Sequence, residues 1–482
     1  MCTPSRRLLS RTFKFASSAG VVAAVLALAG TAWAGEGPKN DEVFKLTTAI
    51  QVPGPGKFFS FDIAWIDTVL NKLFLADRNN KAIDAVDLTT KNIHQFTGPY
   101  AGFTGNNDTS GPDGVLVVDH KEIYVGDSNT NCSAGPPCTT TDPVKFPTTT
   151  PGSGRVWVLD ATNPANLVAV PPGATNPILV GGHGRADELC FDPRNHLIMI
   201  ASPADGFVTF IDTNTKKIAG QLIFDGSSLA GHAPLNATNG LEQCGWSPVT
   251  GKFYQNVPEV DGPGDDTAAG AVAVIDPKTM KVETSFPVPL DACAGPQGMA
   301  FGPNNQILLG CNAASPNGHR NLAIINLHSG AVMATIPDLG GADAVWFNEH
   351  DGHYFIPSCN TDCRTAVPPP GTTEVLGVID AKGHRLDQSA VIASVTTTPT
   401  ATTGNPRTVH SGATNPITNE TYVPIPAPGG RAPAWAPTLC ESAPNKVDTP
   451  LNANGCIVVF APTNPDDRSR FSQERGQDDK QE

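Results

Sequence analysis

One short pattern returns along most of this chain: an apolar strand that ends in Asp or Asn, a polar turn, and a second strand. Full copies stand at 206–220, 270–284 and 321–335, and the first half returns at 155–160 and 375–380. Each copy is typical of a β-hairpin, and another strand pair lies upstream of each one. Units of four antiparallel strands that repeat in this way indicate a β-propeller.

Seven such units align, and the closing of the ring supports that number. The seventh unit offers only three strands, at 407–413, 421–425 and 456–460, while the segment 43–52 (VFKLTTAIQV) precedes the first unit and has no other partner. Pairing these ends in one blade removes a free sheet edge. We therefore predict an all-β fold: a seven-bladed β-propeller of four-stranded blades, closed by the N-terminal strand. The 47 Gly and 44 Pro fit the many turns that this fold needs.

The first 34 residues have the pattern of an export signal. A basic stretch precedes a short apolar core, and Ala32-Trp33-Ala34 provides a small-x-small cleavage pattern. Arg6 and Arg7 resemble a twin-arginine signal, and an ordinary secretory signal is the alternative. We expect a signal peptide at 1–34, one propeller domain at 35–462 and a disordered charged tail at 463–482. The expected location is the periplasm or the outside of the cell.

The charge of the chain narrows the range of partners. Loss of the four cations in the signal, which contains no acids, changes the net charge from −14 to −18. An acidic surface of this kind argues against nucleic-acid and anionic-lipid binding. No second apolar run approaches the ~20 residues that span a bilayer. We therefore expect a small-molecule substrate or ligand and no membrane span; the sequence indicates no oligomeric state.

Eleven cysteines include Cys2, which is lost with the signal, so ten remain for an oxidising compartment. Five disulfides are the expected outcome. Close spacing favours Cys132–Cys138, Cys359–Cys363 and Cys440–Cys456, and the repeat alignment favours Cys190–Cys244 and Cys293–Cys311. A zinc site at Cys359 and Cys363 is the less favoured alternative in this compartment.

The first strands of the seven units align at one position, which we call the first-strand column. Its members are Asp62, Asp113, Asp187, Glu242, Gln297, Asp343 and His410. Five of the seven are carboxylates, and we expect them to meet at one mouth of the propeller channel. Clustered carboxylates must take up protons or attract a cation. The long insertions at 129–154, 259–269, 360–373 and 428–455 belong to loops at the same end, where binding sites commonly form.

The ligand type favours Ca²⁺, because hard oxygen ligands suit it, and His410 adds Zn²⁺, Mn²⁺ or Fe²⁺ as alternatives. A structural role is the competing interpretation of the column. An Asp at the start of an inner strand can cap a turn or accept N–H groups from the next blade.

The units resemble the YVTN-type propeller repeat family, over about 62–462. The outer hairpins carry the likeness, although Tyr124-Val-Gly-Asp127 stands where the tetrapeptide that names the family would be. Gly111-Pro-Asp-Gly-Val115 and Gly295-Pro-Gln-Gly-Met299 also resemble strands of gluconolactonase-like propellers. That second resemblance implies a channel metal held by Glu, Asn and Asp side chains.

Carried over by column position, the implied metal ligands are Glu242 and Asp343, with Asp187 or Asp113 as the third. The column lacks the usual Asn, although Asn239 lies nearby, and this difference leaves the metal's identity open. The predicted metal set is therefore Asp113, Asp187, Glu242 and Asp343.

Four further residues complete the predicted site. His410 or His183 would transfer the proton. Arg185 and Arg407 precede Asp187 and His410 at equivalent places, so they would bind a substrate carboxylate or pair with the acidic ring. His232 is a weaker candidate in another link between blades.

These residues predict an exported metal-dependent hydrolase of the lactonase or ester-cleaving kind. The alternatives are a non-catalytic binding propeller for a small molecule, glycan or protein partner, and a propeller lyase or oxidoreductase subunit. The chain contains no G-x-S-x-G, P-loop, H-E-x-x-H or C-x-x-C-H motif, which leaves serine-nucleophile and covalent-haem chemistry without support.

Overall fold

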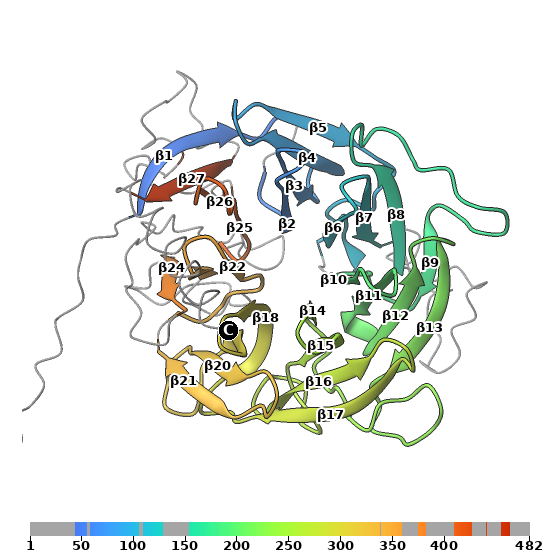
Figure 1. The fold of residues 1–482 in the computed structure, drawn as a ribbon, viewed down its shortest axis with the longest axis vertical. Coiled ribbons are helices and arrows are strands. Elements are labelled where there is room, and N and C mark those ends of the chain that lie inside the picture. Colours follow the sequence, from blue (N-terminus) through green and yellow to red (C-terminus); the bar gives the residue numbers. More distant parts are fainter. Residues whose placement is uncertain are drawn as a thin grey trace, which may run out of the picture. The chain divides into compact units, whose positions relative to one another are not determined.

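A computed structural model describes residues 44–54, 58–105, 109–128, 154–337, 339–358, 375–381, 409–426, 440 and 455–462. Seven antiparallel sheets stand around a common axis, and the prediction of a seven-bladed propeller is confirmed (Figure 1). The predicted signal, the predicted tail, Arg407 and the cysteine pairs 132–138 and 359–363 lie outside the described residues. Within them, the structure contains no helix long and apolar enough to cross a membrane.

The strands follow the order of the chain, and each blade begins with its innermost strand. Blade 1 comprises β2 (Phe61–Asp67), β3 (Lys72–Asp77), β4 (Ala82–Asp87) and β5 (Ile93–Thr97). Blade 2 comprises β6 (Val115–Val118), β7 (Glu122–Asp127), β8 (Gly154–Asp160) and β9 (Ile178–Gly181). Blade 3 comprises β10 (Leu189–Asp192), β11 (Leu197–Ser202), β12 (Phe207–Asp212) and β13 (Lys217–Ile223), with a short 3-10 helix at Pro203–Asp205.

The remaining blades repeat the arrangement. Blade 4 comprises β14 (Cys244–Ser247), β15 (Lys252–Val257), β16 (Gly270–Asp276) and β17 (Lys281–Val288). Blade 5 comprises β18 (Ala294–Gly302), β19 (Gln306–Ala313), β20 (Leu322–Asn326) and β21 (Val332–Ile336). Blade 6 shows three strands within the described residues, β22 (Trp346–Asn348), β23 (His353–Ser358) and β24 (Val375–Asp380).

Blade 7 joins the two ends of the chain, as predicted. It comprises β25 (Ala413–Thr414), β26 (Thr421–Ile425), β27 (Cys456–Pro462) and, as its outer strand, β1 (Phe44–Gln51). β1 pairs antiparallel with β27, and Phe44 lies opposite Pro462. The ring therefore closes through backbone hydrogen bonds between segments about 400 residues apart, and the edge that β27 would otherwise expose is covered.

The recurring Asp at the end of the third strand has a local cause. The Asp212 carboxylate accepts hydrogen bonds from the backbone N–H groups of Asn214 and Thr215, at 2.9 and 2.7 Å. Asp276 accepts from the N–H of Lys278 at 2.7 Å. Such side-chain acceptors stabilise the turn that leads to the fourth strand. The repeat is therefore a turn signal and has no catalytic meaning.

The hydrophobic core consists of seven layers, one between each pair of neighbouring blades. Between blades 3 and 4, for example, Met199, Val208 and Phe210 pack against Phe253 and Ala273, and all five side chains are buried. The layer between blades 1 and 7 includes Ile457 and Val459 of the closing sheet. Because each blade packs only on its neighbours, stability depends on an unbroken ring.

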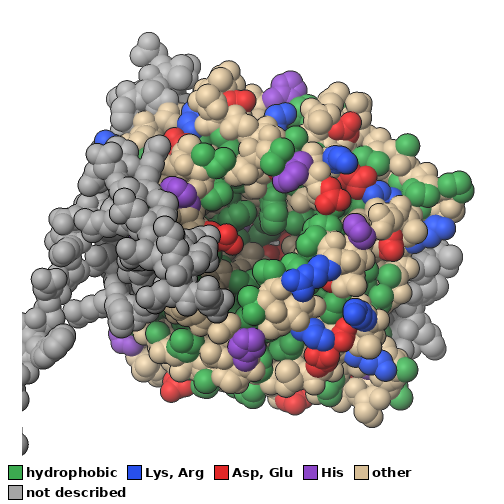
Figure 2. Space-filling view, in the orientation of Figure 1, with side chains coloured by type: hydrophobic (Ala, Val, Ile, Leu, Met, Phe, Trp, Pro, Cys, Tyr) green, Lys and Arg blue, Asp and Glu red, His purple; other side chains and the backbone are tan. Residues whose placement is uncertain are grey.

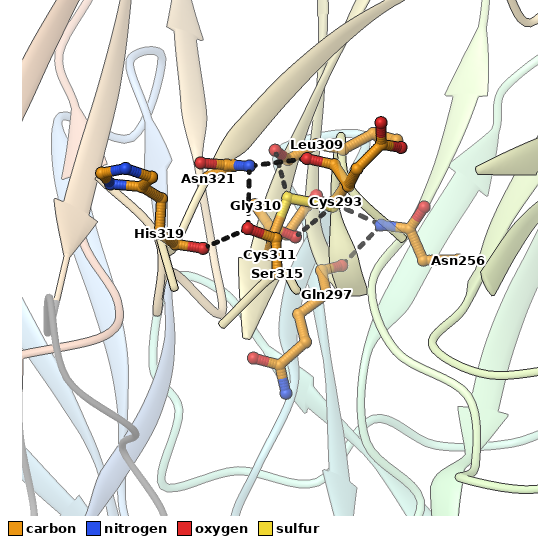
Figure 3. The surroundings of a disulfide bond; sticks show 11 residues. Asn256, Cys293, Gln297, Leu309, Gly310, Cys311, Ser315, His319 and Asn321 are labelled. Atoms are coloured by element: carbon orange, nitrogen blue, oxygen red, sulfur yellow. Dashed lines mark hydrogen bonds between the residues drawn. A yellow bond between two sulfur atoms is a disulfide. The ribbon is translucent and has the colours of Figure 1, made fainter. Parts of the chain in front are cut away.

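Three predicted disulfides are present. Cys190–Cys244 joins the innermost strands of blades 3 and 4, and Cys440–Cys456 links Cys440 to β27. Cys293–Cys311 lies within blade 5. Figure 3 shows it beside Gln297, whose backbone oxygen accepts a hydrogen bond of 2.6 Å from the Asn256 amide of blade 4. The disulfide therefore braces the blade that carries the fifth position of the first-strand column.

Candidate metal centre at the channel mouth

The seven column residues lie at corresponding places in the seven blades. Asp62 and Gln297 are within their innermost strands, and the other five stand two or three residues before theirs. The innermost strands surround the axis of the ring (Figure 1). Space-filling Figure 2 shows a hollow at this centre, with hydrophobic and acidic side chains visible in it. The propeller therefore brings the column together around one channel.

Three groups of ligand-type side chains form there, each with its ligand atoms within 4.8 Å of one another. The groups are Asp62–Asp113–Asp187, Glu188–Glu242–Asp343 and Asp62–Asp343–His410. We call them the buried triad, the acidic triad and the histidine triad. The four predicted metal ligands do not form a single group: Asp113 and Asp187 lie in the buried triad, and Glu242 and Asp343 lie in the acidic triad.

Two arginines hold the buried triad. Arg78, which is 2% exposed, donates from Nε to Asp113 Oδ1 at 2.6 Å and also bonds to Asp62 Oδ2. Arg185 bonds to Asp187 Oδ2 from Nε at 2.8 Å and from Nη2 at 2.5 Å. Its Nε also lies 3.8 Å from Asp113 Oδ1. Arg185 therefore pairs with the acidic ring, which is one of the two roles predicted for it.

The structural explanation of the column applies to its backbone. Asp113 O accepts from the N–H of Ile63 at 3.3 Å, and His410 O accepts from the N–H of Asp343 at 3.1 Å, so carbonyl groups link neighbouring blades. The carboxylates of Asp62, Asp113 and Asp187 bond to arginine side chains instead. The Arg78–Asp113 bond also joins blades 1 and 2, so a structural role accounts for part of the buried acidic side chains as well.

Burial and mutual repulsion govern the acidity of the cluster. Burial raises the pKa of Asp113, and the charges of Arg78 and Arg185 oppose the rise and favour the ionised carboxylate. Burial also raises the pKa of Glu188 well above its ordinary value, and the charges of Asp343, Asp187 and Glu242 add to the effect. Carboxylates in such surroundings favour a bound proton or a cation.

Two oxygens of the buried triad have no hydrogen-bond partner. Asp113 Oδ2 and Asp187 Oδ1 are both buried, while the other oxygen of each carboxylate bonds to an arginine. A buried polar atom without a partner is costly unless water or an ion satisfies it. The donor set of the channel mouth therefore fits a hard cation, since it offers carboxylate oxygens whose hydrogen bonding is incomplete.

Exposure separates the triads. Asp62, Asp113 and Asp187 are all buried, whereas Glu242 and Asp343 in the acidic triad are partly exposed beside buried Glu188. An incoming molecule can reach partly exposed carboxylates but not those enclosed with arginines. The acidic triad is therefore the group best suited to hold a cation in contact with a ligand. Gln297 lies at its edge and donates from Nε2 to Glu242 Oε1 at 3.2 Å.

The two predicted histidines occupy different surroundings. His410 belongs to the histidine triad, with Nε2 3.8 Å from Asp62 Oδ1, and its ring stacks on Phe61 at 4.9 Å. His183 lies in the link before blade 3, where Nδ1 is 2.7 Å from Asp205 Oδ1 and the backbone N–H also bonds to Asp205. His410 is therefore inside the cluster, and His183 is held in a fixed orientation by an acid outside it. His232 has a similar partner, Asp225, at 2.8 Å.

The insertion at 259–269 is the one of the four predicted insertions that the structure describes in full. Glu259 is buried and accepts from the backbone N–H groups of Thr267 and Ala268 at 3.0 and 3.1 Å. Asp266 accepts from the side-chain amides of Asn239 and Asn312, at 2.5 and 3.1 Å. Glu259 and Asp266 therefore hold this loop in place by hydrogen bonds, and the Asn239 side chain bonds to Asp266 of the loop.

Sequence reasoning did not select Glu188 or Arg78 for the site, and it left Asp62 out of the metal set. Glu188 follows Asp187 directly, and both precede β10, so strand alternation does not send them to opposite faces. Arg78 follows β3, whose end lies beside the start of β2 because these strands pair with Phe61 opposite Asp77. The end of the second strand lies beside the acid of the first strand, so an arginine directly after the second strand was the sequence feature that could have identified Arg78.

Comparisons with known proteins support the fold. The WD40 repeats of RRP9 superpose with a TM-score of 0.51 at 10% identity, over 87% of this chain and 99% of that chain. U3-55K gives a TM-score of 0.50 at 11% identity, over 87% of this chain and 98% of that one. No family model matches the chain, and no curated protein matches it. The resemblance to YVTN and gluconolactonase-like repeats thus stays a prediction from motifs, and what this chain is shown to be is a seven-bladed β-propeller similar to WD40 propellers.

Proposed function

We propose that this chain is an exported metal-dependent hydrolase of lactones or esters, with its cation held by Glu188, Glu242 and Asp343. The convergence of these three carboxylates carries the proposal: they come from the starts of three different blades, and their ligand atoms lie within 4.8 Å of one another. Oxygen ligands favour Ca²⁺, and nearby His410 keeps Zn²⁺, Mn²⁺ and Fe²⁺ as alternatives. The motif likeness to gluconolactonase-like propellers and the signal-like N-terminus support the same reaction class and location.

This assignment revises the predicted ligand set. Asp113 and Asp187 bond to arginines and are buried, so we propose that they support the site electrostatically and do not contact the substrate. Glu188 replaces them as the third ligand. When bound, a divalent cation supplies a Lewis acid that polarises the carbonyl of the substrate.

The chain's own groups would orient the reactants and move the proton. His410 is within the cluster, and the Phe61 ring holds its imidazole in one plane. Asp62 Oδ1 lies 3.8 Å from His410 Nε2, so the acid and the imidazole are neighbours within the histidine triad. We therefore assign general acid–base work to His410 and keep His183, which Asp205 orients, as the second candidate.

Elemental analysis of the purified mature protein tests the proposal. We expect one tightly held divalent metal per chain in the wild type and none in a folded Glu188→Gln, Glu242→Gln double variant. Glu349→Gln is the matched control, because it removes an exposed turn carboxylate that follows β22, at the opposite end of that strand from Asp343. The metal-bearing protein should hydrolyse a lactone or ester, and the double variant should lose that activity.

Two results would count against the proposal. A wild type that carries no metal, and gains none on dialysis against Ca²⁺, Zn²⁺ or Mn²⁺, would remove the basis of the mechanism. Metal binding without turnover of any lactone or ester would favour a binding propeller. In that case the acidic triad would be a ligand-binding or stabilising site.

A further inference from the structure

Two tryptophans meet across the channel next to the acidic cluster. The rings of Trp65 and Trp346 lie 5.5 Å apart, centroid to centroid, at an interplanar angle of 64°. Trp65 belongs to β2 of blade 1 and Trp346 to β22 of blade 6. Both are innermost strands, so the pair is formed by residues that surround the central channel (Figure 1).

Blade 7 lies between blades 6 and 1, so its innermost strand, β25, separates β2 from β22. Both β2 and β22 pack against β25, so the indoles can touch only by extending over β25. Ala413 of β25 is completely buried in the core layer between blades 7 and 1, and Trp346 packs against that layer. Each indole is nevertheless only partly buried. The pair thus covers β25 and leaves aromatic surface accessible, in a ring whose central hollow shows hydrophobic side chains (Figure 2).

The tryptophans follow the acids at one fixed spacing. Trp65 stands three residues after Asp62, and Trp346 stands three residues after Asp343. Three residues of extended backbone span at most about 10 Å, so the α-carbon of each tryptophan lies within about that distance of the α-carbon of its acid. Asp62, Asp343 and His410 form the histidine triad. The acid–base group and the aromatic pair therefore lie on the same three blades, 6, 7 and 1.

We propose that the Trp65–Trp346 pair is the substrate-binding floor of this site and that the substrate is a neutral aromatic ester or lactone. The inference rests on the proposed hydrolase function. Indole faces bind aromatic rings through stacking and edge contacts, beyond the gain from burial of apolar area. The channel mouth favours a ligand without an anionic group, because both of the arginines described there already bond to carboxylates.

This assignment distinguishes the pair from an ordinary plug of the channel. If the pair only closed the channel, side-chain volume alone would matter, and Leu could replace Trp346 without loss. A binding floor needs aromatic faces, so Phe should replace Trp346 with little loss and Leu should not. Trp246 offers a matched control, because it also belongs to an innermost strand, β14, but it pairs with the Arg194 guanidinium at 5.2 Å instead of another ring.

The test compares 3,4-dihydrocoumarin, a neutral aromatic lactone, with δ-valerolactone, which has no aromatic ring. Binding is measured by calorimetry on the Glu188→Gln, Glu242→Gln double variant, where turnover does not interfere, and kcat/KM is measured on the metal-bearing protein. Trp346→Leu should weaken dihydrocoumarin binding about tenfold and leave δ-valerolactone unchanged. Trp346→Phe and Trp246→Leu should bind as the parent does.

The outcomes separate the two proposals. Equal binding of both lactones, or a loss in Trp346→Leu that is the same for both, would overturn the aromatic floor even if hydrolysis is confirmed. Selective binding of dihydrocoumarin that depends on Trp346, without turnover in the wild type, would support the floor and refute the hydrolase. Thermal unfolding of every variant identifies a misfolded Leu variant, and Trp65→Leu then provides the second measurement.

Discussion

Arg78 and Asp113 form a buried ion pair between blades 1 and 2, with Arg78 Nε 2.6 Å from Asp113 Oδ1. The same guanidinium also bonds to Asp62, so one cation compensates two acids of the first-strand column. Neither partner reaches solvent, since Arg78 is 2% and Asp113 0% exposed. This bridge compensates two of the five carboxylates of the column, and Arg185 compensates a third, Asp187.

We predict that Arg78→Met destabilises the protein by about 3 to 5 kcal/mol, because it leaves two buried carboxylates without their cation. Urea unfolding at neutral pH measures the change. Arg194→Met is the control, since Arg194 contacts Trp246 and a backbone oxygen, and we expect it to cost under about 1 kcal/mol. Equal stability of the two variants would mean that the bridge contributes little. Adding Asp113→Asn to Arg78→Met should recover part of the loss.

Asp77 and Asp84 make blade 1 sensitive to pH. Both carboxyls are completely buried, and Gln95 Nε2 donates to each, at 3.2 and 3.0 Å. Burial raises the pKa of Asp77 to about 6, and burial with the Asp77 charge raises the pKa of Asp84 well above its ordinary value. Because the folded state binds these protons more tightly than the unfolded chain, their contribution is fully present below about pH 4 and is lost as pH rises through 6.

Asp84→Asn should therefore stabilise the protein at pH 7.5, by on the order of 1 to 3 kcal/mol, and have a smaller effect at pH 5. The amide removes the second charge and can still donate to Asp77. Denaturant unfolding at the two pH values measures the difference from wild type. A stability change that is the same at both pH values would show that the pair does not titrate in this range.

The two blade disulfides should differ in the stability they provide. Cys190–Cys244 spans 54 residues and Cys293–Cys311 spans 18. A cross-link constrains the unfolded chain more when it closes a longer loop, and the chain-entropy relation gives about 4 against about 3 kcal/mol. Paired Cys→Ala variants, compared by chemical unfolding, test the order. A larger loss from the Cys293–Cys311 variant would point to strain or packing as the dominant contribution.

Metal binding at the acidic triad should raise thermal stability. At a free Ca²⁺ concentration 100 times the dissociation constant, a ligand that binds only the folded state stabilises it by about 2.7 kcal/mol. We therefore expect a chelator to lower the Tm of the wild type and added Ca²⁺ to restore it. Glu188→Gln should abolish the response, and Glu349→Gln should retain it. A response that survives in Glu188→Gln would place the cation elsewhere.

Local regularity explains why so much of the fold was predictable. The apolar strands, and the Asp that accepts hydrogen bonds at each outer turn, depend only on residues near one another in the chain. Asp212 and Asp276 therefore predict their hairpins from the sequence alone. Repetition then fixes the number of blades and the column position. The ring leaves one unpaired strand at each end, which identified the β1–β27 closure. The same alignment placed Cys190 opposite Cys244.

The members of the column were predictable, but their roles were not. Asp113 and Glu242 look alike in the alignment, and only packing encloses one with Arg78 and leaves the other partly exposed. Glu188 was not predicted as a ligand because it precedes β10, where the alternation of side chains along a strand does not apply. The pairing of Trp65 with Trp346 likewise depends on two blades that are not neighbours.

The sequence by itself determined the architecture of this protein: seven blades, their closure, the acidic column and the three described disulfides. It could do so because strands, turns and repeats depend on residues that are near one another in the chain. Only the tertiary structure decided which carboxylates share an arginine, which can reach a ligand, and that two tryptophans meet beside them. Those relationships depend on distances between blades, and the chain sets such distances only when the ring closes.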